Sequence, residues 1–448
     1  MKEQIQWLKV SENKRFLIKE DGTPFFWLGD TAWELFHKLT REEAEFYLKN
    51  RAERKFNVIQ AVALAEQDGV RVGNAYGRKP LLQNEKGEYD PTLPDIDGEN
   101  EKYSYDYWKH VDYIIDTAAS LGIYIAILPT WGDKYNIRWG KGPEIFNPDN
   151  ARIYAEWLGN RYKERPNIIW VLGGDRDLTQ AEHFTIMQSM AEGLKKGDEG
   201  RHLITFHPMG GYSSSYHFPD TDWIDFHMIQ SGHGTKNLDN YNKIREDYER
   251  LPVKPVLDGE PRYEDHPIGF KPENGYYDDA DVRQAAYWAV FAGAFGHTYG
   301  HHCVWNMCTQ PSDYFVMDWK TAIMRPGASQ MKYLKALIES RPFLERVPDQ
   351  SIIAANYPGA NHIQATCGNN YGFLYSPNGL PISVNMGKIS GEKVKAYWYN
   401  PRTGKSQFIG EFDNKGTVDF ICPTSGRGND WILVLDDASS NFQEPGKV

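Results

Sequence analysis

Short apolar runs alternate with longer amphipathic segments between about residues 25 and 340 of this chain. The runs are FFWLGD (25–30), NVIQAVAL (57–64), YIAILPTW (124–131), IIWVLGGD (168–175), HLITFHP (202–208), IDFHMIQ (224–230), PVLDGEP (255–261) and HTYGHHCVW (297–305). This alternation predicts parallel strands joined by crossover helices. Eight such units in about 320 residues fit an α/β fold of the (β/α)8 TIM barrel type with inserted loops.

Helix signals occupy the segments between the runs. Thr40 with Glu43 three residues later forms a capping-box pattern at the start of residues 40–55. The pattern over residues 104–122 ends at Gly122, a typical C-terminal cap, and a third covers residues 147–164. An open doubly wound sheet is the main alternative, but no glycine-rich phosphate turn follows the first run.

The longest insertion follows the second run and covers residues 65–103. It contains GVRVGNAYGRKPLL and the polar run DPTLPDIDGEN. Loops of this length are usually functional or disordered, and this one is expected on the face where barrel active sites form.

The pattern changes after residue 345. SIIAANY, NHIQATC, YGFLYS, ISVNMG, KVKAYWYN, KSQFIGEF, TVDFIC and DWILVLDD are short strand-like segments separated by turn signals such as CGNN, SPNG, PRTG and DNKG. We therefore predict a barrel domain over residues 1–345 and a small all-β sandwich over residues 346–440. The final ASSNFQEPGKV is expected to be a loose tail.

Composition limits the function classes. The chain of 448 residues has 50 basic and 61 acidic residues, a net charge of -11, and no cluster of Lys and Arg with aromatics, so a nucleic-acid partner is not expected. Aromatic residues make up 14% of the chain, as expected either for a large core or for a pocket that binds the apolar faces of sugars.

Neither a metal nor another cofactor is indicated. The four cysteines lack C-x-x-C spacing, so neither zinc nor a disulfide framework is expected. The histidines at the strand ends lack H-E-x-x-H spacing, which favours hydrogen bonding to sugar hydroxyls or ordinary packing.

The compartment depends on whether a leader precedes this sequence. The first residues lack the apolar run of a secretory signal, and no window has the roughly 18 apolar residues of a membrane span. We expect a periplasmic or extracellular protein if a signal peptide has been removed, and a cytoplasmic one otherwise. The sequence does not indicate an oligomeric state.

Polar and aromatic residues gather at the predicted C-terminal strand ends, where barrel enzymes bind substrate. The predicted substrate-binding residues are Asp30, Trp33, Trp131, His207, Gln230, His233, Tyr299, His301 and Trp305. Trp131 and Trp305 are candidate stacking platforms, with core packing as the alternative.

Two carboxylates are the predicted catalytic residues. Asp175 ends the fourth strand and Glu260 the seventh, and these two ends face each other across a barrel mouth. A facing pair about 5 to 5.5 Å apart is what a retaining glycosidase requires. The alternatives are a salt bridge between Glu260 and Arg262, and a helix cap at Asp175, although Asp177 is the expected cap of the next helix.

The neighbours of the pair carry further predictions. Gly173 and Gly174 indicate a close backbone approach or room for a ligand. Asp258 shares the strand face of Glu260 and is expected one layer deeper, as a buried acid that needs a donor and either orients the site or has no catalytic part. The nearest approach to a serine-hydrolase elbow, GGYSSS, has the wrong spacing.

Seven motifs in order resemble the apiosidase-like glycoside hydrolases with a C-terminal collagen-binding-type domain. They are FFWLGDTAWELF, NAYGRKPL, LPTWGDKYN, WVLGGDRD, IQSGH, LDGEPRYED and HTYGHHCVW, and AYWYNPRTGKSQFIG is similar to the second domain. The resemblance implies a retaining mechanism with Asp175 as acid/base and Glu260 as nucleophile, acting on a β-apiosyl bond in pectin.

One motif departs from the wider barrel glycosidase clan. That clan has Asn-Glu at the end of strand four, where this chain has Gly174-Asp175, which shortens the acid and removes an amide near the sugar 2-hydroxyl. The predicted partner is therefore an oligosaccharide or polysaccharide of open specificity. Two alternatives are a catalytically inactive carbohydrate-binding barrel and a glycosidase for a different sugar.

Overall fold

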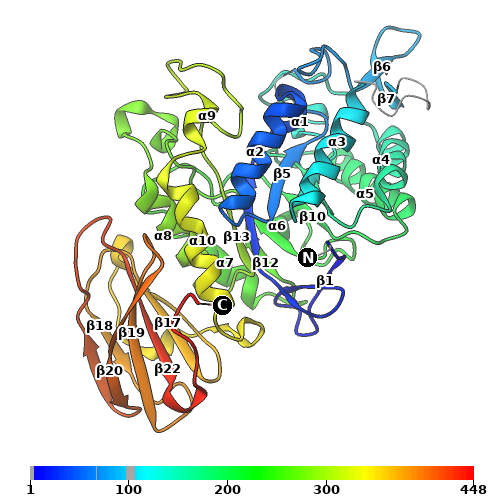
Figure 1. The fold of residues 1–448 in the computed structure, drawn as a ribbon. Helices are drawn as coiled ribbons and strands as arrows, with labels where there is room; N and C mark the ends of the chain where they lie inside the picture. The colour runs from blue at the N-terminus through cyan, green and yellow to red at the C-terminus, as the bar shows by residue number, and fades with distance from the viewer. Residues whose placement is uncertain (1–4, 67, 97–105, 448) are drawn as a thin grey trace.

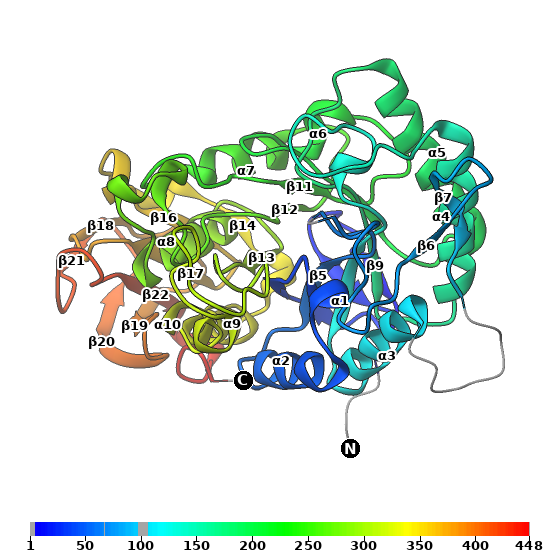
Figure 2. The same ribbon diagram turned by 90° about the horizontal axis from the view of Figure 1, so that it is seen from above.

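The computed structural model describes residues 5–66, 68–96 and 106–447, and its larger part is a barrel of eight parallel strands (Figures 1 and 2). In chain order these strands are β4 (Trp27–Thr31), β5 (Val58–Val62), β8 (Tyr124–Leu128), β9 (Ile168–Gly173), β10 (Ile204–His207), β11 (His227–Ile229), β12 (Val256–Asp258) and β13 (Gly296–Tyr299). Each predicted run contains one of them. All eight strands are buried along their whole length, as expected for a sheet covered on both faces.

The sheet is nearly closed. Its order is β10-β9-β8-β5-β4-β13-β12-β11, so β10 and β11 are the two edges. Across this seam the Asp225 amide donates to the Ile204 carbonyl at 2.9 Å, and Thr205 Oγ1 donates to the Phe226 carbonyl at 2.6 Å. The predicted TIM-type barrel is confirmed.

The helices surround the strands (Figure 2). They are α1 (Leu35–Lys38), α2 (Arg41–Glu53), α3 (Tyr107–Ser120), α4 (Pro148–Tyr162), α5 (Ala181–Gly197), α6 (Ser214–His217), α7 (Asn240–Glu249), α8 (Asp279–Phe291), α9 (Trp319–Ala322) and α10 (Pro326–Glu339). Thr40 and Glu43 form the predicted capping box of α2, and Gly122 follows α3 with a φ of 78°. None of the helices in the described ranges is long and apolar enough to cross a membrane.

Two small sheets accompany the barrel. β1 (Leu8–Val10), β2 (Leu17–Lys19) and β3 (Pro24–Phe25) form an antiparallel sheet before the first barrel strand. In the long insertion, β6 (Leu81–Gln83) and β7 (Tyr89–Pro94) form a hairpin. The end of the predicted polar run, from residue 97 onward, lies outside the described residues.

The C-terminal part is an antiparallel all-β domain, as predicted. One sheet contains β14 (Val347–Pro348), β16 (Gln364–Cys367), β17 (Tyr371–Ser376), β19 (Lys393–Asn400), β20 (Lys405–Asp413) and β22 (Trp431–Asp437). The other contains β15 (Ile353–Ala355), β18 (Ile382–Asn385) and β21 (Thr417–Phe420). Each predicted segment contains one strand, and β14 is an additional short one.

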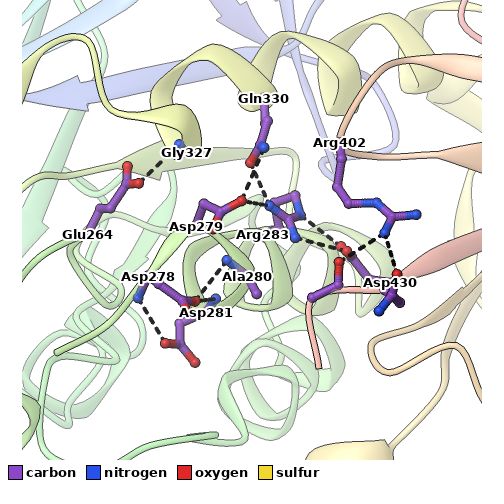
Figure 3. Close-up of polar contacts among 12 residues, drawn as sticks. Glu264, Asp278, Asp279, Ala280, Asp281, Arg283, Gly327, Gln330, Arg402 and Asp430 are labelled. Carbon is purple, nitrogen blue, oxygen red and sulfur yellow. Dashed lines mark hydrogen bonds and ion pairs between the residues drawn. The ribbon is translucent and has the colours of Figure 1, made fainter. Parts of the chain in front are cut away.

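This domain packs against α8 and α10 at one side of the barrel (Figure 1). The ring of Tyr375 on β17 stacks on Tyr287 of α8, with centroids 4.9 Å apart and an interplanar angle of 16°. Figure 3 shows a polar contact at the same interface, where the buried Arg283 of α8 binds both oxygens of Asp430 at 2.9 Å. The two domains therefore share an apolar interface that contains a buried ion pair.

The C-terminal segment is packed, so the predicted loose tail is wrong. Arg341 lies 4.5 Å from the centre of the Phe442 ring and donates to the Gln443 carbonyl at 3.1 Å. The Gly446 amide donates to Ser340 Oγ at 3.2 Å. These contacts attach the segment to the end of α10.

Candidate active site

A cavity of about 580 Å³ lies at the C-terminal ends of the barrel strands. Asp175 and Glu260, the predicted catalytic pair, both line it. The predicted substrate-binding residues that line it are Trp33, Trp131, Gln230, His233 and Trp305. The strand-end rule therefore brings residues from distant parts of the chain into one site.

Asp30 and Tyr299 were predicted to bind substrate, but they lie outside this lining. They are register partners on β4 and β13, and both point toward the helices. Asp30 accepts hydrogen bonds from Tyr47 and Arg51 of α2, and the Tyr299 hydroxyl donates to Glu264 at 2.6 Å. Side chains alternate between the two faces of a strand, and this pair falls on the outer face.

His301 also lies outside the cavity lining, and His207 lies behind it. His301 Nε2 is 3.1 Å from Asp265 Oδ2, and Asp265 in turn accepts a hydrogen bond from Arg325. His207 is fully buried and contacts Glu260. Both histidines contact acidic side chains of the protein and are fully buried, so neither is exposed to the cavity.

The backbone before Asp175 explains the two glycines. Gly173, Gly174 and Asp175 have φ values of 90°, 113° and 51° in succession. A Cβ on Gly173 would lie 2.4 Å from the His207 carbonyl oxygen, and one on Gly174 would lie 3.1 Å from the Trp131 ring. Only glycine fits both positions, and Asp is one of the few residues that tolerate the left-handed conformation that follows.

Asp177 is not the predicted helix cap. Helix α5 begins at Ala181, and Gln180 precedes it without a side-chain capping bond. Asp177 Oδ1 instead lies 3.1 Å from His217 Nε2, on the short helix α6. The loop after β9 is longer than the pattern indicated, so the acid reaches the neighbouring β10–β11 connection.

The surroundings of Asp175 favour its protonated form. Its pKa is raised to about 6, first because it is withdrawn from water and second because the charge of Glu260 is close. Arg176 Nη1, 3.6 Å from Asp175 Oδ2, and a hydrogen bond from Gln230 oppose this rise only in part. The carboxyl group faces the cavity, with 26% of the side chain exposed.

The pKa of Glu260 is shifted in the opposite direction. Burial by itself would raise its pKa, but contacts with His207 and His233 outweigh burial and lower the pKa to about 2. His207 Nε2 lies 3.0 Å from Oε2, and His233 Nε2 lies 3.1 Å from Oε1. The alternative salt bridge with Arg262 is wrong, because Arg262 bonds to Gln284 at 3.1 Å.

Asp258 is the predicted buried acid with donors. It accepts hydrogen bonds from Ser231 Oγ at 2.7 Å and from Asn240 Nδ2 at 3.0 Å. Strand β12 ends at this residue, so the strand alternation assumed for Glu260 does not continue. Because Ser231 lines the cavity and Asn240 begins α7, Asp258 links the cavity wall to the helix layer.

Several cavity residues were not predicted as site residues. The acid and the aromatic residues among them are Glu66, Trp139, Tyr263, His266, Phe270 and Tyr314, which lie beyond the strand ends. Glu66 follows the second apolar run by two positions, and Tyr263 and His266 follow the DGEP motif. A search for acids and aromatics in the first residues after each run would have found these three. The predicted location of the insertion beside the site is confirmed at Glu66.

The cysteines form no disulfide within the described ranges. All four cysteines are buried and unpaired as disulfides. Within the described ranges, no group of three His, Cys, Asp or Glu side chains has metal-binding geometry.

The family profile described as "Apiosidase-like, catalytic domain" matches residues 11–345, which is the barrel with its cavity. The chain belongs to this apiosidase-like family. The profile described as "Putative collagen-binding domain of a collagenase" matches residues 347–436, the all-β domain. No curated protein matches the chain.

Solved structures agree with the family. A glycoside hydrolase family 5 protein from Bacteroides vulgatus is 37% identical, with a TM-score of 0.88 over 98% of this chain and 95% of its own. A second structure, described as a glycoside hydrolase, is 38% identical, with a TM-score of 0.86 over 98% of both chains. The family and these relatives support a glycosidase.

Proposed function

We propose that this chain is a retaining glycoside hydrolase that cleaves a pectic β-apiosyl bond, with Asp175 as acid/base and Glu260 as nucleophile. The observation that carries the proposal is that two carboxyl groups in one cavity have pKa values shifted in opposite directions. The pKa of Asp175 is raised to about 6, and that of Glu260 is lowered to about 2. Pairs of carboxyls whose pKa values are pushed apart in this way typically divide the acid and nucleophile roles.

The first step forms a covalent intermediate. The ionised Glu260 attacks the anomeric carbon, while the protonated Asp175 donates its proton to the departing glycosidic oxygen. As the Glu260 carboxylate becomes an ester, its negative charge disappears, and the pKa of Asp175 falls. Asp175 then accepts a proton from water, which attacks the glycosyl ester and releases the sugar.

The environment of Glu260 favours this role. A nucleophile must be ionised and correctly oriented, and one histidine contacts each of its oxygens. His207 is fully buried, so its ring is fixed by packing against Trp33 and Trp131 at centroid distances of 5.4 and 6.1 Å. The carboxylate is therefore oriented before substrate arrives.

The cavity wall offers groups that suit a sugar. Trp33 and Trp131 lie side by side with ring centroids 5.1 Å apart, and both line the cavity. Within the described part of the chain, Trp131 Nε1 and Gln230 Oε1 have no hydrogen-bond partner. The C–H face of a sugar can contact the two rings, and the polar side chains around them provide hydrogen-bonding groups. The apiosyl specificity is supported by family membership.

The test is a product screen followed by stereochemistry. The wild-type protein is incubated with apiose-bearing pectic fragments and with a panel of aryl glycosides, and proton NMR records the anomer that forms first. We expect the released sugar to keep the configuration of the bond that is cleaved. An inverted product would refute the retaining mechanism, and oligosaccharide binding without any product would favour a catalytically inactive binding barrel.

Two matched substitutions test the assignment of the acid. Asp175→Asn should lower turnover by several orders of magnitude on substrates with poor leaving groups, and Asp177→Asn should have a small effect. The opposite ranking would show that the wrong aspartate had been assigned.

A further inference from the structure

The cavity has two chemically distinct ends. At one end, Glu260 contacts His207 and His233, and the sugar that it attacks must lie against it. At the other end, Asp175 contacts Arg176. In the proposed mechanism, the oxygen that Asp175 protonates remains with the leaving group. The part of the cavity around Asp175 and Arg176 is therefore where the leaving group lies.

Arg176 organises this second end. Its side chain is fully buried, and it donates to the backbone carbonyls of Asp175 and Asn136 at 2.7 and 3.2 Å. It also donates to the Trp139 carbonyl, and its guanidinium lies 4.3 Å from the centre of the Trp139 ring. Its Nη2 atom is 3.4 Å from Glu66 Oε1. One buried cation thus fixes three cavity-lining residues in relation to each other.

Trp139 presents a partly exposed aromatic ring to the cavity. It lies in the loop after β8 and is 38% exposed while lining the cavity. An exposed ring in a cavity wall offers a flat apolar face of the kind that contacts sugar C–H groups. Arg176 and Arg138 lie near the ring, the latter at 5.2 Å from its centre, and Arg138 is itself exposed.

Glu66 is a polar cavity residue that contacts the same arginine, Arg176. Its side chain is only 17% exposed, and withdrawal from water raises its pKa to about 7, although Arg176 opposes the rise. The nearby charges of Asp133 and Asp175 raise the pKa of Glu66 further. A carboxyl group withdrawn from water in this way is stabilised by hydroxyl partners, to which it donates when protonated and from which it accepts in either state.

We propose that Glu66 and Trp139, both positioned by Arg176, form a binding site for the sugar unit on the leaving-group side of the scissile bond. The Trp139 ring contacts the C–H face of that sugar, and the Glu66 carboxyl group forms hydrogen bonds with its hydroxyls. This inference rests on the proposed function. A single sugar ring fills only part of the cavity of about 580 Å³, so there is space for a second unit.

The first test uses Glu66→Ala, which removes the carboxyl group that is proposed to bind the sugar hydroxyls. Its kcat/KM is compared with wild type on an apiose-bearing pectic oligosaccharide and on 4-nitrophenyl β-D-apiofuranoside, whose leaving group has no hydroxyls to bind. We expect the loss on the oligosaccharide to exceed the loss on the nitrophenyl glycoside at least tenfold. A difference below threefold would overturn the site.

The second test measures binding, since a nitrophenyl ring could itself stack on Trp139. The oligosaccharide left after cleavage is titrated into wild type and into Trp139→Ala by calorimetry. We expect Trp139→Ala to raise the Kd at least tenfold, with an unchanged melting temperature showing that the variant is folded. Tyr216→Ala is the control, because Tyr216 is 66% exposed and is not among the residues that line the cavity.

The outcomes separate the two proposals. Wild-type turnover with an equal Kd for Trp139→Ala would refute the leaving-group site alone. Absence of wild-type turnover on both substrates would refute the proposed function, and this site with it.

Discussion

His207 Nε2 lies 3.0 Å from Glu260 Oε2, where His207 is fully buried and 8% of the Glu260 side chain is exposed at the cavity. The residue at the end of β10 thus controls the charge of a residue that follows β12. Because this contact and the one from His233 lower the pKa of Glu260 to about 2, Glu260 is ionised except in strongly acidic solution. This arrangement leads to the first prediction.

Substituting His207 by Phe should move the acidic limb of the activity profile upward. The variant removes one of the contacts that lower the pKa of Glu260, and burial then raises this pKa by about 1–3 units. Glu260 is active when ionised, so kcat/KM should begin to fall at a higher pH as the solution is acidified. His217→Phe, which removes a histidine that contacts Asp177, is the control. Superimposable acidic limbs would contradict the role of His207.

The basic limb of the same profile should report Asp175. The pKa of this acid is about 6, and only the protonated form can donate to the leaving oxygen. In wild type, kcat/KM should therefore fall about tenfold per pH unit above pH 6. In Asp175→Asn this limb should disappear from the residual activity on activated aryl glycosides. A basic limb that survives in that variant would have to come from another group.

The raised pKa of Asp175 should depend on Glu260. In Glu260→Gln the nearby negative charge is absent, so the ionised form of Asp175 is less disfavoured and its pKa should fall below 6. The measurement is a carboxyl titration by carbon NMR on protein labelled at aspartate, with Asp175→Asn used to assign the signal. Burial also contributes, so the pKa should stay above the usual value for Asp. An unchanged titration would mean that burial alone sets it.

Replacing Gly173 by Ala should destabilise the protein and reduce activity. The new Cβ would lie 2.4 Å from the His207 carbonyl, and a φ of 90° disfavours any residue except glycine. Gly22→Ala is a matched control, because its φ is 88° and a Cβ there would meet nothing within 4 Å. The control should cost only backbone strain, about 1–2 kcal/mol. Equal shifts in melting temperature for the two variants would show that the close approach does not matter.

The buried ion pair between the domains should contribute to stability and not to catalysis. Within the described ranges, Asp430→Ala leaves the buried Arg283 with Asp279 and Gln330 as hydrogen-bond partners, and such a loss typically costs about 3–5 kcal/mol. Asp413→Ala at the exposed pair with Lys393 is the control and should change the melting temperature little. Since no residue after 345 is among those that line the cavity, kcat/KM of folded Asp430→Ala should match wild type.

The features that local pattern determines were accessible from the sequence. Eight apolar runs correspond to eight strands because a buried parallel strand must be apolar along its length, and the turn signals after residue 345 mark the second domain for similar reasons. The rule that strand ends converge brought Asp175 and Glu260 to one cavity, because it depends only on the order of the strands.

Other features depend on contacts between distant segments. Asp30 and Tyr299 are predicted to bind substrate, but their side chains lie on the outer face of the barrel. Which face a strand residue occupies depends on the register of that strand in the sheet, which the sequence pattern does not show. Asp177 was assigned as a cap, but the long loop after β9 directs it to His217. Glu66 and Trp139 reach the cavity through irregular loops that have no periodic pattern.

The sequence therefore determined the barrel, the second domain and the identity of the two facing carboxylates. The resemblance implied that Asp175 is the acid, and only the tertiary structure supplied the physical reason. Burial raises the pKa of both groups, but His207 and His233 contact the two oxygens of Glu260, whereas the effect of His207 on Asp175 is smaller than that of burial. A protonation state depends on neighbours in space, and those neighbours are 27 or more positions away in the chain.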